Sequence, residues 1–316
     1  MSFAGELASL PLEALLARAR NADSRAVSSS LGPSRLRLED FACLISPAAG
    51  EQLETLARQA HLITKQRFGL VIRLFAPLYL SNECVNNCVY CGFARSNPIG
   101  RVTLSTDEVL VEARALKQQG FRNLLLVASE NPARVSAEYL ESCVKMLRRE
   151  IPSLSLEVGA LDTESYRRLV AAGAEGLVIY QETYDRELYA TLHPSGPKRN
   201  FDWRLGAPER AHAAGFRRLG IGALLGLKDW RADAICLAAH AVYLLRNCWK
   251  SFLTVSVPRL RPCAGRFIPQ YPVPDRELVQ LVCALRIFLP DVGIVLSTRE
   301  PARLRDGLIP LGITLM

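Results

Sequence analysis

Eight short apolar runs beyond residue 70, separated by segments of helical period, constrain the fold of this chain more than any other feature. Parallel strands need long crossover connections, which are usually helices, so this alternation indicates βα units around a parallel sheet. The runs are residues 71–80, 123–129, 155–161, 176–182, 218–227, 252–260, 293–299 and 309–316. Eight runs predict an α/β fold of the closed (β/α)8 TIM-barrel type, although a doubly wound open sheet fits the same alternation.

Local signals predict where the helices between these runs begin and end. The segment Ser105–Glu108 has the pattern of a capping box, and Asp162 and Asp229 are candidate N-caps. Pro274 stands where a first-turn proline is tolerated. The glycines predicted to end helices are Gly120, Gly173 and Gly215.

Residues 1–70 are predicted to form an N-terminal helical extension, and residues 71–316 the barrel. The extension has helical period over two or three segments. The stretch Ser24–Ser34 interrupts them, and its serine, glycine and proline content predicts a connecting loop.

Composition excludes several classes of protein. Charged residues make up 22% of the chain, and no apolar run approaches the roughly 18 residues that cross a bilayer, so no membrane span is predicted. The first residues lack the pattern of a signal peptide, which predicts a cytoplasmic protein. The net charge is +8, but the basic residues are dispersed along helices without interleaved aromatics. This favours an anionic small-molecule site over nucleic-acid binding.

Three of the nine cysteines crowd into SNECVNNCVYCGF, directly after the first run, as Cys84, Cys88 and Cys91. An odd number of cysteines, clustered in this way, favours metal ligation over a disulfide framework. Three thiolates at the spacing C-x3-C-x2-C can hold a 4Fe-4S cubane and leave one iron without a protein ligand. A ferredoxin cluster or a structural zinc site needs a fourth ligand, and none follows within the loop. Chance clustering, or a zinc site completed from elsewhere, remains the alternative.

The resemblance to a known family rests on seven segments in this order: PLYLSNECVNNCVYCGF, LLLVASE, VIYQETY, FDWRLGAPER, GIGALLGL, VSVPRLRPC and LSTRE. On these segments the chain resembles the radical S-adenosylmethionine (SAM) superfamily from about residue 35 to its last residue. It is most similar to the aromatic amino acid lyases, in particular the tyrosine lyases that make 2-iminoacetate for the thiazole of thiamine.

The resemblance implies a 4Fe-4S cluster whose open iron binds SAM, and a 5'-deoxyadenosyl radical formed when SAM is cleaved reductively. In the tyrosine lyases this radical takes a hydrogen from the amino group of L-tyrosine. The Cα–Cβ bond then breaks, and the products are p-cresol and 2-iminoacetate, also called dehydroglycine.

For the cofactor, the resemblance implies contacts next to the cysteines. Tyr90 matches the aromatic position that packs near the adenine, and a core tyrosine is the alternative. Ser129 and Glu130 match a Gly-Gly-Glu-like turn at the end of the second strand, whose carboxylate accepts hydrogen bonds from the ammonium group of SAM. A solvated glutamate at the strand end is the other interpretation.

Later segments add further cofactor positions by the same resemblance. Gln181 and Glu182 match residues that contact the ribose hydroxyls or the methionyl moiety, and Arg204 matches a guanidinium that holds the cofactor carboxylate. Gly222 and Leu225 would let the fifth strand approach the adenine closely, with tight barrel packing as the alternative.

On the substrate side, Arg299 matches the residue that binds the amino acid carboxylate, and Tyr79 matches a tyrosine near the substrate amino group. Arg259 and Arg261 form a second basic pair, for which structural salt bridges are the alternative. Cys263 is a loop cysteine whose role stays open, with packing favoured over catalysis.

His193 lies in the segment HPSGPKRN, where it could move protons or gate the site with Lys198 and Arg199. A surface loop is the favoured interpretation of this segment.

The resemblance implies L-tyrosine as substrate, a flavodoxin- or ferredoxin-type reductant, and a thiazole synthase as a further partner. Family members continue past the eighth strand with a serine-containing turn and a terminal helix, whereas this sequence ends at Met316, so incomplete C-terminal closure is expected. Three interpretations stay open: an active tyrosine lyase, a truncated and catalytically impaired paralogue that keeps cluster and SAM binding, and a lyase for tryptophan.

Overall fold

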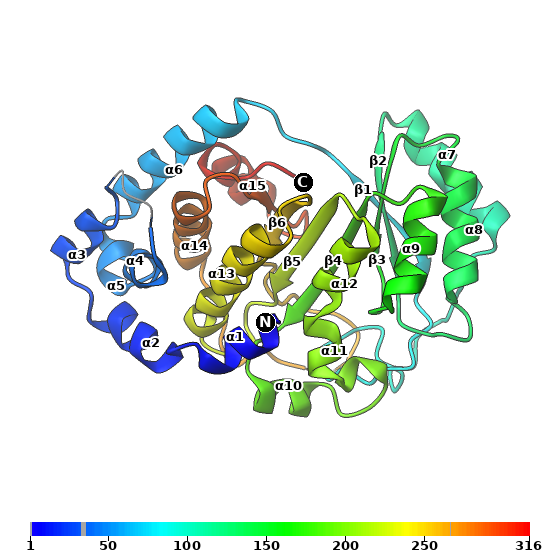
Figure 1. The fold of residues 1–316 in the computed structure, drawn as a ribbon, viewed down its shortest axis with the longest axis horizontal. Coiled ribbons are helices and arrows are strands. Elements are labelled where there is room, and N and C mark those ends of the chain that lie inside the picture. The colour runs from blue at the N-terminus through cyan, green and yellow to red at the C-terminus, as the bar shows by residue number, and fades with distance from the viewer. Residues whose placement is uncertain (1, 33–35, 266) are drawn as a thin grey trace.

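In the described part of the chain, seven parallel strands form one sheet, and strands that follow each other along the chain are also neighbours in space (Figure 1). The computed structural model describes residues 2–32, 36–265 and 267–316. The strands are β1 (Ala76–Ser81), β2 (Asn123–Ala128), β3 (Ser153–Glu157), β4 (Gly176–Glu182), β5 (Arg218–Ala223), β6 (Phe252–Ser256) and β7 (Gly293–Val295). This is the parallel, TIM-barrel-like arrangement that repeated βα units produce.

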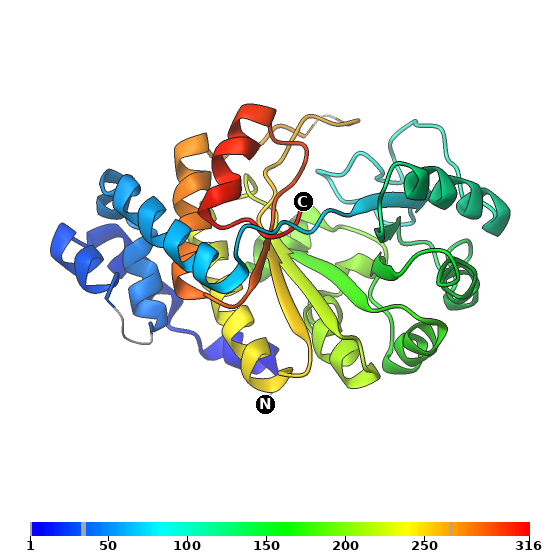
Figure 2. The same cartoon turned by 90° about the horizontal axis from the view of Figure 1, so that it is seen from above.

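Helices cover the outer face of the sheet (Figure 2). They are α7 (Thr106–Gln118), α8 (Ala137–Leu147), α9 (Thr163–Ala172), α10 (Arg186–Leu192), α11 (Phe201–Leu205), α12 (Ala207–Ala214), α13 (Trp230–Asn247), α14 (Asp275–Phe288) and α15 (Ala302–Leu308). The predicted N-terminal signals are confirmed, because Ser105 and Glu108 form a capping box and the side chains of Asp162 and Asp229 accept backbone N–H groups. No helix in the described ranges is long and apolar enough to cross a lipid bilayer.

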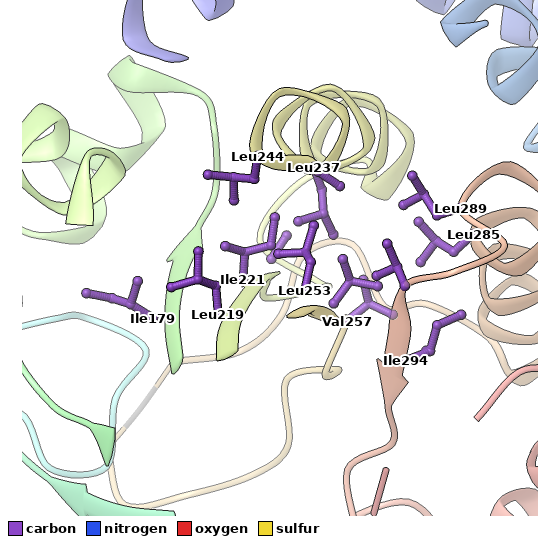
Figure 3. Packing of buried hydrophobic residues seen from close by; sticks show 14 of the residues in the cluster. Ile179, Leu219, Ile221, Leu237, Leu244, Leu253, Val257, Leu285, Leu289 and Ile294 are labelled. Carbon is purple, nitrogen blue, oxygen red and sulfur yellow. The ribbon is translucent and has the colours of Figure 1, made fainter. Parts of the chain in front are cut away.

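The hydrophobic core lies between the sheet and these helices. Leu219 and Ile221 of β5 and Leu253 of β6 face Leu237 and Leu244 of α13 (Figure 3), and none of the five is more than 3% exposed. Burial of such a side chain contributes roughly 1.5–3 kcal/mol each, so this layer holds the sheet and its outer helices together.

Alternate residues of each strand point the other way, into the lumen of the barrel. In β1, Leu78 and Leu80 are 3% and 0% exposed, whereas Tyr79 between them is 55% exposed. The register places lumen residues of neighbouring strands at one level, since Tyr79 pairs with Val127 of β2 and Val127 pairs with Glu157 of β3. The lumen is therefore accessible at the carboxyl end of the strands.

Within the described residues before the sheet there are six helices, where the sequence predicts two or three. They are α1 (Phe3–Ser9), α2 (Leu12–Asn21), α3 (Ser24–Ser29), α4 (Leu38–Leu44), α5 (Pro47–Glu51) and α6 (Leu53–Phe68). Helices α2, α4 and α6 pack on α13 and α14, so the extension covers the outside of the barrel (Figures 1 and 2).

The loop predicted over Ser24–Ser34 is wrong for its first six residues, which form α3. The Asp23 carboxylate caps this helix by accepting the backbone N–H of Ala26 at 2.8 Å, and Val27 is fully buried. A cap and one buried contact are enough to outweigh the low helix propensity of serine. Residues 33–35 of the predicted loop lie outside the described residues.

The last predicted run, residues 309–316, is corrected from a strand to a 3-10 helix, η2 (Ile309–Leu311), and a bridged segment. Leu315 forms parallel bridges with Val295 of β7 and with Arg73, which precedes β1. Pro310 has no backbone N–H to donate to a neighbouring strand, which disfavours a strand at the start of this run. The final residues thus lie between the last strand and the segment that leads into the first.

Candidate active site

A cavity of about 390 Å³ opens at the carboxyl end of the strands. It is lined by ten of the residues that the sequence proposes for the site: Tyr79, Cys84, Cys88, Tyr90, Cys91, Ser129, Glu130, Glu182, Arg204 and Arg299. The other three, Gln181, Gly222 and Leu225, do not line it. The fold therefore brings together residues that are more than 200 positions apart in the sequence, as the barrel topology requires.

The cysteines lie on the long connection between β1 and α7, which is held in shape by Arg101. Its guanidinium donates hydrogen bonds to the backbone carbonyls of Asn82 at 2.8 Å, Phe93 at 2.9 Å, Ala94 at 2.7 Å and Asn97 at 3.1 Å. A planar guanidinium with several donors suits such a role, because it satisfies carbonyls that a loop cannot pair with itself. Arg101 thereby fixes the path of the chain before and after the cysteines.

Asn86, inside the cysteine motif, connects the loop to two other segments. Its Nδ2 donates to the Glu130 carboxylate at 2.7 Å and lies 3.7 Å from the Cys84 sulfur, and its Oδ1 accepts the backbone N–H of Lys198 at 2.9 Å. The Asn86 side chain is 2% exposed. One buried amide thus sets the position of the cysteine loop relative to Glu130 and to the segment that carries Lys198.

The three motif cysteines are free thiols that face the same cavity. Burial raises the pKa of Cys88 to about 11, and nearby Lys198 opposes this shift. Burial also raises the pKa of Cys91. Metal ligation requires thiolates, so ligand binding here displaces protons.

These residues fit a 4Fe-4S cluster, because the motif supplies three thiols from one loop to one cavity. In the part of the chain that the structure describes, no three Cys, His, Asp or Glu side chains are arranged to hold a single metal ion. A cubane does not require that arrangement, since each thiolate binds a different iron.

Glu182 ends β4 at a bulge where the register with β5 shifts. Its φ is +72°, and it is the one non-glycine residue with positive φ among those described. Its carboxylate forms ion pairs with Lys198 at 2.7 Å and Arg204 at 3.6 Å, and all three side chains are at most 14% exposed. Burial alone would raise the pKa of Glu182, but these two cations outweigh it and lower the pKa below its usual value. The strained backbone thus presents a carboxylate to the cavity that is charged at neutral pH.

The surface loop favoured for His193 is wrong, because this side chain is fully buried behind Tyr90. Its Nδ1 lies 2.8 Å from the Tyr189 carbonyl oxygen, and its Nε2 lies 2.8 Å from the Tyr90 hydroxyl. A carbonyl only accepts, so Nδ1 carries the proton and Nε2 accepts from Tyr90. Burial, assisted by Lys198, lowers the pKa of His193 to about 4, so the ring is neutral at pH 7.

The three proposed residues that do not line the cavity make packing or hydrogen-bond contacts within the barrel wall. Gln181 is buried, with its amide 3.5 Å from the Phe201 carbonyl. Leu225 forms a β-bridge with Arg259, and its neighbour Leu224 lines the cavity instead. Because side chains alternate along an extended chain, a shift of one residue exchanges the position that faces away from the cavity for the one that lines it.

Gly222 packs against the next strand and against Tyr180, which lines the cavity. A Cβ on Gly222 would lie 2.5 Å from the Ser256 carbonyl oxygen and 2.7 Å from the Tyr180 ring. This is the tight barrel packing that the sequence left open for the glycine-rich strand.

The variant Gly222→Ala is expected to lower the free energy of unfolding by about 1–3 kcal/mol, because overpacking forces the Tyr180 ring or a strand to move. Urea titration measures the loss. Gly100→Ala is the control, since a Cβ added at Gly100 would have no atom within 4 Å, and a change within about 0.5 kcal/mol is expected. Equal losses in the two variants would contradict the packing role of Gly222.

Arg259 and Arg261 serve as salt-bridge partners. Both guanidinium groups bind the buried carboxylate of Glu300, and Arg259 also pairs with Asp275 at 2.7 Å. Cys263 is exposed at the rim of the cavity, with its sulfur 3.5 Å from the Tyr90 carbonyl oxygen.

Among the cavity residues that sequence reasoning missed are two polar ones, Asn86 and Glu157. Asn86 is one of two asparagines in the cysteine motif, and nothing in the motif distinguishes them. Glu157 offered a signal, since it is the one charged residue of the predicted run 155–161, although the sequence does not show that the strand ends there.

Comparison with known proteins agrees with this geometry. Residues 78–236 match the model of the radical SAM superfamily, and residues 256–316 match that of the biotin and thiamin synthesis associated domain. The chain is 42% identical to 2-iminoacetate synthase of Salmonella typhimurium over 91% of its own length and 76% of that protein, and 43% identical to that of Escherichia coli over the same shares.

Among solved structures, the [FeFe]-hydrogenase maturase HydG matches with a TM-score of 0.91 and 32% identity, covering 96% of this chain and 70% of that one. HydG from Carboxydothermus hydrogenoformans matches with a TM-score of 0.87 and 38% identity, covering 93% and 68%. These likenesses confirm the predicted fold class. The chain belongs to the radical SAM superfamily and, within it, to the family of the 2-iminoacetate synthases.

Proposed function

We propose that this protein is a radical SAM lyase that cleaves the Cα–Cβ bond of L-tyrosine. The products are 2-iminoacetate and p-cresol, with 5'-deoxyadenosine and methionine as co-products, and the 2-iminoacetate serves the synthesis of the thiamine thiazole. The observation that carries the proposal is the meeting of Cys84, Cys88 and Cys91 with Glu130 and Arg299 in one cavity, in a chain 42% identical to a 2-iminoacetate synthase.

In this proposal, Cys84, Cys88 and Cys91 hold the 4Fe-4S cluster. When bound, the cluster and SAM supply the radical that removes a hydrogen atom from the substrate. Glu130 has an oxygen free to accept a hydrogen bond from the SAM ammonium group, because Asn86 occupies only the other.

Two further groups orient the ligands in the proposed site. Arg204 is held by the Tyr180 carbonyl at 2.6 Å and faces the cavity, where it can bind a carboxylate of the cofactor. Arg299 offers its guanidinium to the carboxylate of tyrosine. Tyr79 lies beside the cluster loop, with its ring centroid 6.3 Å from that of Phe93, at the level of Glu157. These contacts fix which bond of the substrate faces the radical.

We also propose a flavodoxin- or ferredoxin-type protein as the electron donor and a thiazole synthase as the acceptor of 2-iminoacetate. Both steps require exchange between proteins, because the reaction consumes an electron and its imine product hydrolyses in water. A reducing cytoplasm suits the nine cysteines, all of which are free thiols.

The test is anaerobic reconstitution with iron and sulfide, followed by EPR of the reduced protein with and without SAM. A 4Fe-4S signal that changes on SAM addition is expected, together with equal amounts of p-cresol and 5'-deoxyadenosine when tyrosine is supplied. Purified protein that contains zinc in place of iron would overturn the proposal. Turnover of tryptophan in preference to tyrosine would keep the radical chemistry and correct the substrate.

A further inference from the structure

Glu157 is the last residue of β3 and lies at the same level of the sheet as Tyr79. The two residues flank Val127 of β2, which pairs with both. Neighbouring strands are about 4.8 Å apart, so the backbones at Tyr79 and Glu157 are separated by roughly 10 Å. Both side chains line the cavity, and a small polar group between them is within reach of each.

Most of the charged side chains that line the cavity are already committed. Glu182 pairs with Lys198 and Arg204, and Arg261 binds Glu300. Because each of these groups is already paired with a group of opposite charge, we do not expect any of them to make the first contact with the charged groups of the amino acid substrate.

Three charged groups of the cavity have no ion-pair partner in the described ranges: Glu130, Glu157 and Arg299. Glu130 is bonded to Asn86 beside the cysteine loop, which places it at the cofactor end. The Arg299 guanidinium reaches only the hydroxyl of Ser297, at 3.5 Å. The Glu157 side chain makes no hydrogen bond to any described residue. One cation and one anion thus remain at the substrate end, and an amino acid zwitterion is their charge complement.

We infer that Glu157 binds the amino group of the amino acid substrate and accepts its extra proton, while Arg299 binds the carboxylate. This inference rests on the proposed function and names the residue that prepares the substrate for it. The transfer turns the substrate ammonium into a neutral amine and the Glu157 carboxylate into a carboxylic acid. No bond to carbon changes and no electron is moved. The neutral amine has the lone pair that stabilises a nitrogen-centred radical, which the ammonium form lacks.

The surroundings of Glu157 suit a proton acceptor. Burial is the main cause that raises its pKa to about 7; Glu182 adds to this, and the cations nearby oppose it. The charged and titratable groups that face it in the cavity are Tyr79, Tyr180, Glu182, Lys198, Arg204 and Arg299. A carboxyl group whose pKa lies near the operating pH exchanges protons efficiently, and a bound ammonium stabilises its charged form.

The test compares three ligands on the reconstituted, SAM-loaded protein without reductant, by anaerobic isothermal titration calorimetry. Tyramine lacks the carboxylate of tyrosine, and 3-(4-hydroxyphenyl)propanoate lacks the amino group. Glu157→Gln is expected to lower the affinity for L-tyrosine and tyramine by about 10- to 100-fold, which is the contribution of a charge-assisted hydrogen bond. The affinity for the propanoate is expected to stay unchanged. The matched variant Arg299→Gln is expected to lower the affinity for tyrosine and the propanoate and to leave the affinity for tyramine unchanged.

The pH dependence gives a second readout. In the wild-type protein, tyramine affinity is expected to rise about tenfold from pH 6 to pH 8, because Glu157 must be ionised to receive the ammonium group and its pKa is about 7. In Glu157→Gln this rise is expected to disappear. A purely structural role of Glu157 would not link ligand charge to pH in this way.

Equal weakening of all three ligands by Glu157→Gln, or an unchanged pH profile, would overturn the inference. If the glutamine variant loses the EPR signal of its cluster, the variant Glu157→Asp is used in its place. A lower affinity for L-tyrosine and tyramine, but not for the propanoate, is again the expected result. Failure of the proposed function is distinguishable, since wild-type protein would then bind none of the three ligands and form no p-cresol.

Discussion

Cys88→Ala is expected to reduce the iron content, the EPR signal and p-cresol formation to background after anaerobic reconstitution. Cys88 is the most buried of the three motif thiols, at 4% exposure, and it stands at the centre of a loop whose path is fixed by Arg101. Two remaining thiolates cannot replace the third, because each binds a different iron of the cubane.

The matched control is Cys263→Ala, which removes a thiol from the rim of the same cavity but from outside the motif. We expect it to keep both the iron content and the EPR signal. A full cluster in Cys88→Ala, or its loss in Cys263→Ala, would show that the ligands are assigned to the wrong cysteines.

Glu182→Gln is expected to destabilise the protein by about 3–5 kcal/mol, because it leaves Lys198 and Arg204 buried without their anion. The glutamine keeps the shape of the side chain, so the change reports on charge. Asp202→Asn is the control, since Asp202 pairs with Arg186 on the surface, with both side chains about half exposed, and such pairs contribute about 0–1 kcal/mol. Urea unfolding at pH 7 measures both variants.

The same ion pairs predict an acid-sensitive protein. The pKa of Glu182 is lowered in the folded state: burial would raise it, but Lys198 and Arg204 act more strongly in the opposite direction. The folded carboxylate therefore binds a proton more weakly than the unfolded one. Its stabilising effect is complete above the ordinary pKa of glutamate, about 4.3, and is lost as the pH falls below it. A wild-type and a Glu182→Gln protein that lose stability equally as the pH falls from about 5 to about 2 would contradict this account.

The repeated architecture could be predicted from local patterns. The apolar runs located β2 and β4 to within one residue, and the capping signals located the starts of α7, α9 and α13. The errors fall where local preference and packing disagree. Residues 71–75 have strand composition, but only Arg73 is bridged, so β1 begins at Ala76.

The candidate site was predictable to the extent that its residues follow strands or share a motif. The cysteine spacing is a local property, and Glu130, Glu182 and Arg299 stand at the carboxyl ends of strands, where barrels collect their polar groups. His193 was misplaced, because burial of a loop depends on contacts with a distant segment, here Tyr90 more than 100 residues earlier in the chain.

The sequence by itself determined the βα repeat, the helix caps and the three thiols, because period, capping and motif spacing act over a few residues. Only the tertiary structure decided which charges neutralise one another and which remain for a ligand. Lys198 and Arg204 form ion pairs with Glu182, whereas Glu157 and Arg299 have no counter-ion in the described chain and remain for the two charged groups of the substrate. Electrostatic pairing depends on distance in space and on burial, and both arise only when strands far apart in the sequence close around a common lumen.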